Sequence, residues 1–462
     1  MRSLLHGDYR LRGWKGDPFY LEYFPTRTLR RLRPAEFAFL VKCDGQTELE
    51  PDAWPPEPEW ARAEGVIVPC GAGGALLPEQ EYRLYPNRFL HYLELSVTGR
   101  CNFHCKHCFN APGAEPRTVE PGFEQLVALL DELDRCGVGR LRLDGGEPLV
   151  RRDFLALTAE MAKRGILAYE IITNGSRITP SLLDALESQG HRPKWYVSFD
   201  GLGHHDWLRG VPGAEERVLE NIRLMCERGY YVHVHQCVWR DSVDSVRPTA
   251  LKLKELGVSR LRLTTVEPSV RWMQLCPEQT ISTEEWQARI PDFLDWWYGN
   301  SLNMDLDVWS YWVHNRGSKF AMIVPDLRSR ASSDDAPACV HALQRPFIDA
   351  DGRLLPCIAS SGLAAAMGIE WGNVYRDSLQ ELYTQSPFLD QLSRTCGQIK
   401  DSSPHCQSCR WKPICSAGCR AEALVQGNSL TGVDERVCSF FESGCYAKLL
   451  AAAGKWGLKT TA

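Results

Sequence analysis

The chain has 462 residues, a formal net charge of -5 and a hydrophobic fraction of 44%. This length allows two or three domains, and the acidic balance argues against a protein that binds nucleic acid by bulk electrostatics. No apolar run is long enough to cross a membrane and the N-terminus lacks a signal-peptide core, so we expect a cytoplasmic protein without membrane partners.

Residues 1–88 form a first segment with Pro-rich stretches and little clear periodicity. Apolar residues at helical spacing predict a helix over 32–43, and a second helix is expected over 59–64. A short strand over 65–68 follows. We therefore expect a small α+β N-terminal domain.

From residue 89 onward, strand-like runs alternate with amphipathic helical patterns. Strands are expected over 90–97, 140–144, 166–173, 194–199, 231–239 and 260–266. Helices are expected between and after them, over 123–136, 154–164, 180–188, 215–228, 246–256 and 284–297. Six strand–helix units predict an α/β fold, a partial (β/α)6 TIM-like barrel over residues 89–300. Chemistry in such barrels lies at the carboxyl ends of the strands.

The remaining chain changes character twice. Residues 301–338 read as a less regular bridge, and residues 339–445 form a cysteine-rich domain. Within that domain, residues 347–357 predict a hairpin that turns at Asp351-Gly352. The C-terminal tail, residues 446–462, is expected to hold a short helix over 447–453.

Three cysteines follow the first barrel strand with the spacing C-x3-C-x2-C: Cys101, Cys105 and Cys108. This spacing is too tight for three independent core cysteines. It allows all three sulfurs to converge on one side of a loop, as an iron–sulfur cluster requires. A [4Fe-4S] cluster has four irons, so three thiolates leave one iron open to another ligand. In a cytosolic chain, clustered cysteines of this kind indicate metal ligation rather than disulfides.

This loop resembles the signature of the radical S-adenosylmethionine (SAM) superfamily. The resemblance implies that the open iron binds SAM, and that the reduced cluster cleaves SAM to a 5'-deoxyadenosyl radical, which abstracts hydrogen from a substrate. It also implies that Phe109, directly after the last cysteine, lies beside the adenine. Here the protein supplies the binding site and the cofactors supply the reactivity.

Further motifs of that superfamily follow the next strands. Gly145-Gly146-Glu147-Pro148 matches its GGEP motif, which implies that Glu147 pairs with the SAM ammonium group. Thr173-Asn174-Gly175 and Ser198-Phe199-Asp200-Gly201 resemble its later SAM-contacting segments, and Arg209 resembles its carboxylate-binding arginine. Read alone, each of these polar residues also suits a turn or a helix cap. The implied cofactor-binding residues are Phe109, Gly145, Gly146, Glu147, Thr173, Asn174, Ser198, Asp200 and Arg209.

A second cysteine group in the C-terminal domain is similar to the SPASM extension, which binds two auxiliary [4Fe-4S] clusters in peptide-modifying enzymes. The resemblance implies an outer cluster held by Cys406, Cys409, Cys415 and Cys438. It implies an inner cluster held by Cys339, Cys357 and Cys419. With the loop cysteines, this makes three [4Fe-4S] clusters. The alternative is a pair of zinc sites, since C-x2-C pairs also bind zinc.

The inner set departs from the fully ligated pattern, which has a further cysteine shortly before the position of Cys339. This chain has Ser332, Ser333, Asp334 and Asp335 there. Either the inner cluster has an open iron, or a distant residue completes it. The distant candidates are Cys276, Cys396, Cys445, Asp334 and Asp335.

The N-terminal segment also carries a short resemblance, over residues 39–47 and 64–67, to the peptide-recognition element of peptide-modifying enzymes. That module is winged-helix-like and binds a leader peptide as an added edge strand. The alternative is an extension that packs on the barrel.

Together the motifs predict a radical SAM/SPASM enzyme that acts on a ribosomally made peptide or protein. The auxiliary clusters could accept electrons, which favours a thioether or carbon–carbon cross-link, or another oxidation. The alternatives are an epimerase, a maturase of a porphyrin or sugar, and, in another class, a zinc-ribbon interaction protein. The expected partners are the peptide and an electron donor such as flavodoxin or ferredoxin. No catalytic acid or base is assigned, although Asp241, Glu267, Tyr311 and His314 occupy rim or bridge positions.

Overall fold

The computed structural model describes residues 2–49, 56–71, 73–108, 118–327, 334–360, 372–385, 387–427 and 429–460. Phe109, Ser332 and Ser333 lie outside the described residues. Within the described parts of the chain, no helix is long and apolar enough to cross a membrane.

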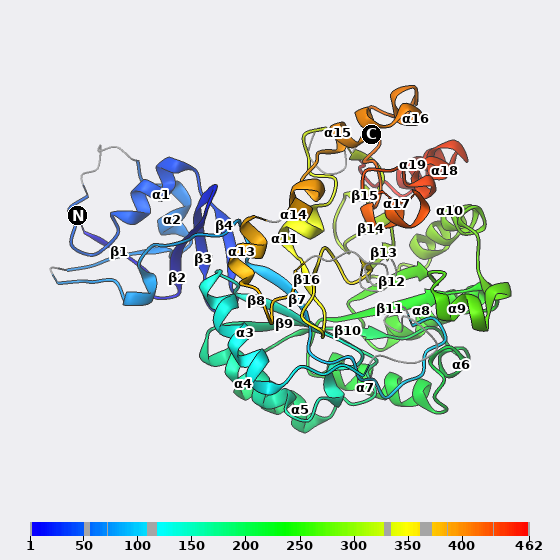
Figure 1. Cartoon of the computed structure of the whole chain (residues 1–462), viewed down its shortest axis with the longest axis horizontal. Coiled ribbons are helices and arrows are strands. Elements are labelled where there is room, and N and C mark those ends of the chain that lie inside the picture. The colour runs from blue at the N-terminus through cyan, green and yellow to red at the C-terminus, as the bar shows by residue number, and fades with distance from the viewer. Residues whose placement is uncertain are drawn as a thin grey trace.

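The N-terminal segment contains more strand than its sequence predicts. The helices expected there are present as α1 (Pro34–Val41) and α2 (Glu59–Ala63), and the expected strand is β5 (Ile67–Pro69), which pairs with β1 (Ser3–Leu5). A four-stranded sheet of order β4-β3-β2-β6 adds β2 (Tyr9–Trp14), β3 (Asp17–Tyr23), β4 (Thr28–Arg31) and β6 (Arg83–Tyr85). Helix α1 and the sheet share an apolar core of their own. Figure 1 shows this segment to one side of the barrel.

All six predicted barrel strands are present, side by side and parallel. They are β7 (Tyr92–Ser96), β8 (Arg140–Asp144), β9 (Leu167–Thr173), β10 (Lys194–Ser198), β11 (Val232–Val238) and β12 (Arg260–Thr265). The helices are α3 (Phe123–Arg135), α4 (Phe154–Lys163), α5 (Pro180–Ser188), α6 (His205–Arg209), α7 (Ala214–Glu227), α8 (Val246–Glu255), α9 (Val270–Leu275) and α10 (Thr283–Gly299). The predicted α/β partial barrel is therefore confirmed.

The sheet continues into the range that the sequence predicts to be an irregular bridge. Strand β13 (Asp305–Val308) pairs parallel with β12, and β14 (Trp312–His314) and β15 (Ala321–Ile323) follow antiparallel. The prediction missed them because strands of three or four residues hold too few alternating positions to show a clear period of two.

The cysteine-rich domain is joined to the other edge of the sheet. Its predicted hairpin is present: β16 (Phe347–Ile348) pairs antiparallel with β17 (Leu354–Leu355) and parallel with β7. Gly352 turns the hairpin with φ +86°, and a Cβ there would lie 2.4 Å from the Tyr375 ring. The surrounding helices are α11 (Val340–Gln344), α13 (Leu379–Thr384), α14 (Pro387–Leu392), α15 (Cys396–Ser402), α16 (Pro404–Gln407), α17 (Arg420–Gly427), α18 (Glu435–Glu442) and α19 (Cys445–Lys455).

The two faces of the barrel sheet differ sharply in polarity. Alternate residues such as Leu93, Val232 and Val234 belong to the main hydrophobic core. The residues between them carry polar side chains that are still buried, for example Glu94 at 1% exposure and His233 at 2%. Because side chains alternate along a strand, one face packs under the helices and the other lines a polar interior.

Candidate functional site

The cysteine loop is fixed by the turn that follows the second barrel strand. The amide of Gly146 donates to Thr98 O at 2.7 Å, and the amide of Glu147 donates to Arg100 O at 2.9 Å. A Cβ on Gly146 would lie 2.3 Å from Arg100 O. The double glycine therefore permits a close approach of two backbone segments, which places Glu147 beside the loop.

Two of the three loop sulfurs, those of Cys101 and Cys105, face hydrogen-bond donors. Phe103 N lies 3.4 Å from Cys101 Sγ, and Asn174 Nδ2 lies 4.0 Å from the same sulfur. Arg209 Nη1 lies 3.6 Å from Cys105 Sγ. Donors of this kind stabilise thiolate ligands, and hydrogen bonds to sulfur tune iron–sulfur clusters.

Glu147 is fully buried and held by three donors. It accepts from Thr173 Oγ1 at 2.8 Å, Asn174 N at 2.6 Å and Leu149 N at 3.1 Å. Burial raises the pKa of its carboxyl to about 7. A carboxylate has about four acceptor positions, so this arrangement leaves capacity for one further donor, such as an ammonium group.

Asp200 and Arg209 form a buried ion pair rather than two separate contact points. Arg209 Nε lies 2.5 Å from Asp200 Oδ2, and Arg209 Nη2 donates to Oδ1 at 3.1 Å. The Cys237 amide donates to Oδ1 at 3.1 Å, and His205 Nδ1 lies 3.2 Å from Oδ2. Burial would raise the Asp200 pKa, but Arg209 and His205 hold it well below the ordinary range. Asp200 thus positions Arg209 toward Cys105, while Ser198 ends β10 half-buried.

Four cysteines in the C-terminal domain line one pocket that is open to solvent, with about 340 Å³ of space: Cys406, Cys409, Cys415 and Cys438. Trp411 N lies 3.4 Å from Cys409 Sγ and Ala417 N lies 3.4 Å from Cys415 Sγ. Burial raises the pKa of the Cys438 thiol to about 12. Neighbouring thiols at this density would repel one another as thiolates unless cations compensated them, and iron supplies that charge. The residues therefore fit a cluster.

The cysteines predicted to hold the inner cluster also lie near one another. Burial comes first among the causes that raise the pKa of Cys357 to about 12, and the charges of Cys419 and Cys339 add to it. The hydroxyl of Ser360, a buried residue, lies 3.3 Å from Cys357 Sγ. Three converging thiols again fit a cluster.

Four of the five distant candidates for a fourth inner ligand, Asp334, Cys396, Cys445 and Cys276, are engaged elsewhere. Asp334 pairs with Lys400 Nζ at 2.5 Å. Cys396 Sγ donates to Ser416 O at 3.3 Å, and Cys445 Sγ donates to Gln287 O at 3.6 Å. Cys276 packs in an apolar cluster with Trp272.

The direction of hydrogen bonding separates the two kinds of cysteine. The sulfurs of Cys101, Cys409 and Cys415 accept from backbone amides. Four cysteines outside the predicted ligand sets, Cys43, Cys70, Cys396 and Cys445, instead donate to carbonyl oxygens, as in Cys43 to Phe39 O at 3.6 Å. The first arrangement suits a thiolate and the second a protonated core thiol.

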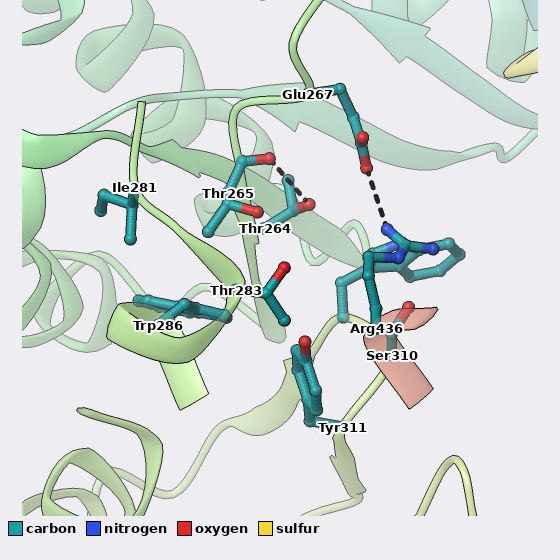
Figure 2. A pocket seen from close by; sticks show the side chains of 10 residues that line it. Thr264, Thr265, Glu267, Ile281, Thr283, Trp286, Ser310, Tyr311 and Arg436 are labelled. Carbon is teal, nitrogen blue, oxygen red and sulfur yellow. Dashed lines mark hydrogen bonds and ion pairs between the residues drawn. The ribbon is translucent and has the colours of Figure 1, made fainter. Parts of the chain in front are cut away.

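A pocket with about 380 Å³ of space open to solvent lies between the barrel rim and the C-terminal domain (Figure 2). Glu267 and Tyr311 line it, whereas Asp241 is exposed and His314 contacts Ser318 O at 3.0 Å. Figure 2 shows Glu267 directed at Arg436, and the two groups are 3.6 Å apart. Sequence reasoning missed Arg436 because α18 reaches this rim from more than 160 residues away in the chain. The other lining residues are Thr264, Thr265, Ile281, Thr283, Trp286, Trp309 and Ser310.

Two family models match the chain. The model of the radical SAM superfamily matches residues 95–239, and SPASM, an iron–sulfur cluster-binding domain, matches residues 339–410. Among curated proteins, the AdoMet-dependent heme synthase of Methanosarcina barkeri is 25% identical over 337 residues, 71% of this chain and 90% of that protein. The PqqA peptide cyclase of Granulibacter bethesdensis is 24% identical over 347 residues, 71% of this chain and 82% of that protein.

Solved structures with this fold cover between 79% and 94% of the chain. Streptococcus suis SuiB bound to precursor peptide SuiA matches with a TM-score of 0.65 and 15% identity, covering 94% of this chain and 99% of that one. Native anSMEcpe with bound AdoMet and a peptide matches with a TM-score of 0.58 and 17% identity, covering 79% and 99%. At these identities the likeness shows the fold.

Proposed function

Because the chain is a radical SAM enzyme that also carries a SPASM domain, we propose that it oxidatively modifies a ribosomally made peptide or protein. The modification is a cross-link or another net loss of hydrogen. The observation that carries the proposal is the pocket between the barrel rim and α18, because Arg436 brings the cluster-binding domain directly against the face where barrel chemistry occurs.

The loop cysteines would hold the cluster that reduces SAM and so supplies the hydrogen-abstracting radical. In this proposal Glu147 binds the ammonium group of SAM, and Thr173 and Asn174 orient the Glu147 carboxylate. The remaining predicted contacts are Phe109, Gly145, Gly146, Ser198 and Arg209. One guanidinium nitrogen of Arg209 lies near Cys105, and another donates to Asp200. Asp200 is therefore a residue that positions Arg209.

The C-terminal cysteines would hold two auxiliary clusters, which can accept the electron that a net oxidation releases. Cys406, Cys409, Cys415 and Cys438 surround the outer site, and Cys339, Cys357 and Cys419 surround the inner one. Three four-iron clusters amount to about twelve irons per chain.

Several observations support a peptide as the substrate. The SuiB and anSMEcpe structures were solved with peptides, and PqqA peptide cyclase is named for one. The N-terminal sheet also has an edge strand, β4, that exposes Arg30 and Arg31, and an extended leader peptide can pair with such an edge.

A porphyrin substrate is the second candidate, since the heme synthases are as similar in sequence as the peptide cyclases. The two candidates are separated by incubating the anaerobically purified, iron-loaded enzyme with SAM, reductant and either a peptide encoded beside its gene or a porphyrin. We expect 5'-deoxyadenosine and a peptide lighter by two hydrogen atoms. Conversion of the porphyrin alone would reject the peptide proposal, and zinc without SAM cleavage would reject both.

The affinity for SAM is expected to depend on pH through Glu147. Burial raises the pKa of this carboxyl to about 7, and only its ionised form attracts an ammonium group. Affinity should therefore fall by up to about tenfold for each pH unit below 7 and level off above it. Equilibrium dialysis with labelled SAM between pH 5.5 and 8.5 measures this (an assay range of about three units). Glu147→Gln should bind weakly with no such slope, and an identical slope in both proteins would exclude Glu147 as the partner.

Replacement of Cys415 by alanine should separate SAM cleavage from product formation. The outer cavity would lose one of its four thiols, so we expect about four fewer irons per chain. SAM cleavage should stay within about twofold of the wild type, whereas modified peptide should fall at least about tenfold. Cys226→Ala, at a half-buried cysteine of α7, is the matched control and should change neither quantity. If Cys415→Ala loses SAM cleavage and modified peptide equally, the outer cluster does not act in product formation alone.

A further inference from the structure

The pocket between the barrel rim and the C-terminal domain contains a carboxylate that faces its open space (Figure 2). Of the ten residues that line this pocket in the described part of the chain, Glu267 alone carries a carboxyl group. Its side chain is 48% exposed, and its ion pair with Arg436 spans 3.6 Å. A carboxylate has about four acceptor positions, so Glu267 can still accept from a molecule that enters the pocket.

The barrel side of the pocket lies close to the cysteine loop. Thr264 lines the pocket at the end of β12 and pairs in the sheet with Cys237 of β11. Burial raises the pKa of the Cys237 thiol, and the charges of Cys105 and Glu267 add to this effect. The Cys237 thiol therefore has a loop cysteine and the pocket carboxylate as electrostatic neighbours, which brings the pocket near the predicted site of SAM cleavage.

The opposite side of the pocket leads to the inner group of cysteines. Arg436 Nη1 lies 3.6 Å from Glu267 Oε1 and 3.2 Å from Glu422 Oε1. The backbone amide of Glu422 donates to Cys419 Sγ, one of the three thiols predicted to hold the inner cluster. Glu267 therefore lies between the loop that would generate the radical and the cluster site that would receive an electron.

The other polar groups of the pocket do not take up a proton at neutral pH. The Arg436 guanidinium is already protonated. Burial raises the pKa of the Tyr311 hydroxyl to about 12, so this group is protonated as well. The threonine and serine hydroxyls are far weaker bases than a carboxylate. Among the described residues that line the pocket, Glu267 is thus the one suited to accept a proton.

We propose that Glu267 accepts the proton that the peptide releases when it is oxidised in this pocket. The role rests on the proposed function, a net loss of two hydrogens. One hydrogen leaves the peptide as an atom, which the SAM-derived radical takes up. The other leaves as an electron, which an auxiliary cluster can accept, and as a proton, which passes to Glu267 and then to water. In a cross-link, the new bond joins the two positions that lost hydrogen.

The test uses the iron-loaded enzyme with SAM, reductant and the peptide encoded beside its gene, and measures both 5'-deoxyadenosine and modified peptide. The variants are Glu267→Gln, Glu267→Asp and Glu267→Ala. In each of them Arg436 keeps Glu422 at 3.2 Å and Asp434 at 3.3 Å, so the rim contact should survive, and the iron content checks this. The matched control is Asp241→Ala, which removes an exposed carboxylate that does not line the pocket.

We expect Glu267→Gln to form modified peptide at least about a hundredfold more slowly, because an amide cannot take the proton. The 5'-deoxyadenosine formed per modified peptide should rise at least about tenfold. Glu267→Asp should retain part of the activity. Sodium formate should raise product formation at least about tenfold in Glu267→Ala, where a small carboxylate can enter the vacated space, but not in Glu267→Gln. Asp241→Ala should match the wild type with and without formate.

Two results would overturn the role of Glu267 while leaving the proposed function in place. One is a rate of product formation in Glu267→Gln within about twofold of the wild type. The other is a loss of product in Glu267→Ala that formate does not reverse, because it would show that Glu267 acts only by holding Arg436. If the wild-type enzyme forms no modified peptide, the proposed function is rejected, and the role of Glu267 with it.

Discussion

Replacing Cys105 by alanine is expected to abolish formation of 5'-deoxyadenosine while leaving the C-terminal clusters in place. The change removes one of three loop thiols and also the sulfur that faces Arg209 Nη1 at 3.6 Å. Two thiolates cannot hold a four-iron cluster with one open iron, so no electron can reach SAM there. Iron should fall from about twelve to about eight per chain, and cleavage should fall below detection.

Iron and sulfide analysis, with a chromatographic assay for 5'-deoxyadenosine, checks this result. The matched control is Cys43→Ala, because the Cys43 thiol is also buried but donates to a backbone carbonyl in the N-terminal segment. It should retain full iron and full cleavage. Residual cleavage in Cys105→Ala above a few per cent would mean that the loop is not the site of SAM reduction.

Arg209→Ala is expected to destabilise the folded barrel by about 3–5 kcal/mol, since it leaves Asp200 as an uncompensated buried charge. Asp200 has no exposed surface and its carboxylate receives two bonds from this guanidinium. The loss should be largest above the depressed pKa of Asp200, which covers the whole neutral range. Urea unfolding followed by circular dichroism measures the free energy of unfolding.

Two further variants identify the cause. Asp200→Asn combined with Arg209→Ala should recover part of the stability, because the buried charge is removed with its partner. Arg247→Ala breaks the surface pair with Asp292 and should cost less than about 1 kcal/mol. If Arg209→Ala costs no more than Arg247→Ala, the buried pair does not stabilise the fold.

The sequence predicts the barrel well because each barrel strand can be recognised from its own residues and their immediate neighbours. Each has an apolar run, a following helix and a polar turn, as in Leu141 and Leu143 before Gly145-Gly146. The strands β2 to β4 were missed because residues such as Arg10, Arg12, Glu22 and Arg30 interrupt their apolar pattern. Arg12 and Glu22 are buried together as an ion pair at 3.6 Å, and a sequence pattern does not reveal which charges pair.

The same distinction between local patterns and long-range contacts applies to the candidate site. Motifs within one loop, such as the three cysteines and Gly145 to Glu147, are visible because their spacing is fixed by the local backbone. Contacts between distant segments are not, as the rim contact between Glu267 and Arg436 shows. The motif implies that Asp200 lies beside SAM, but only the structure shows that its carboxylate already accepts from Arg209 and from the Cys237 amide.

Strand β16 lies directly against β7, the first strand of the barrel (Figure 1). Glu94 N donates to Pro346 O at 2.9 Å, and the Glu94 carboxylate lies 3.2 Å from His341 Nε2. Because these strands share one sheet, we expect the regions matched by the two family models to unfold together. A gene fusion or truncation that cuts before residue 339 would uncover the hydrogen-bonding edge of β7 and the polar interior behind it, inviting aggregation. A chimera that exchanges the cluster-binding domain between relatives would have to keep the β16–β17 hairpin together with its partner strand β7. The segment that must be exchanged is therefore larger than the cluster-binding domain alone.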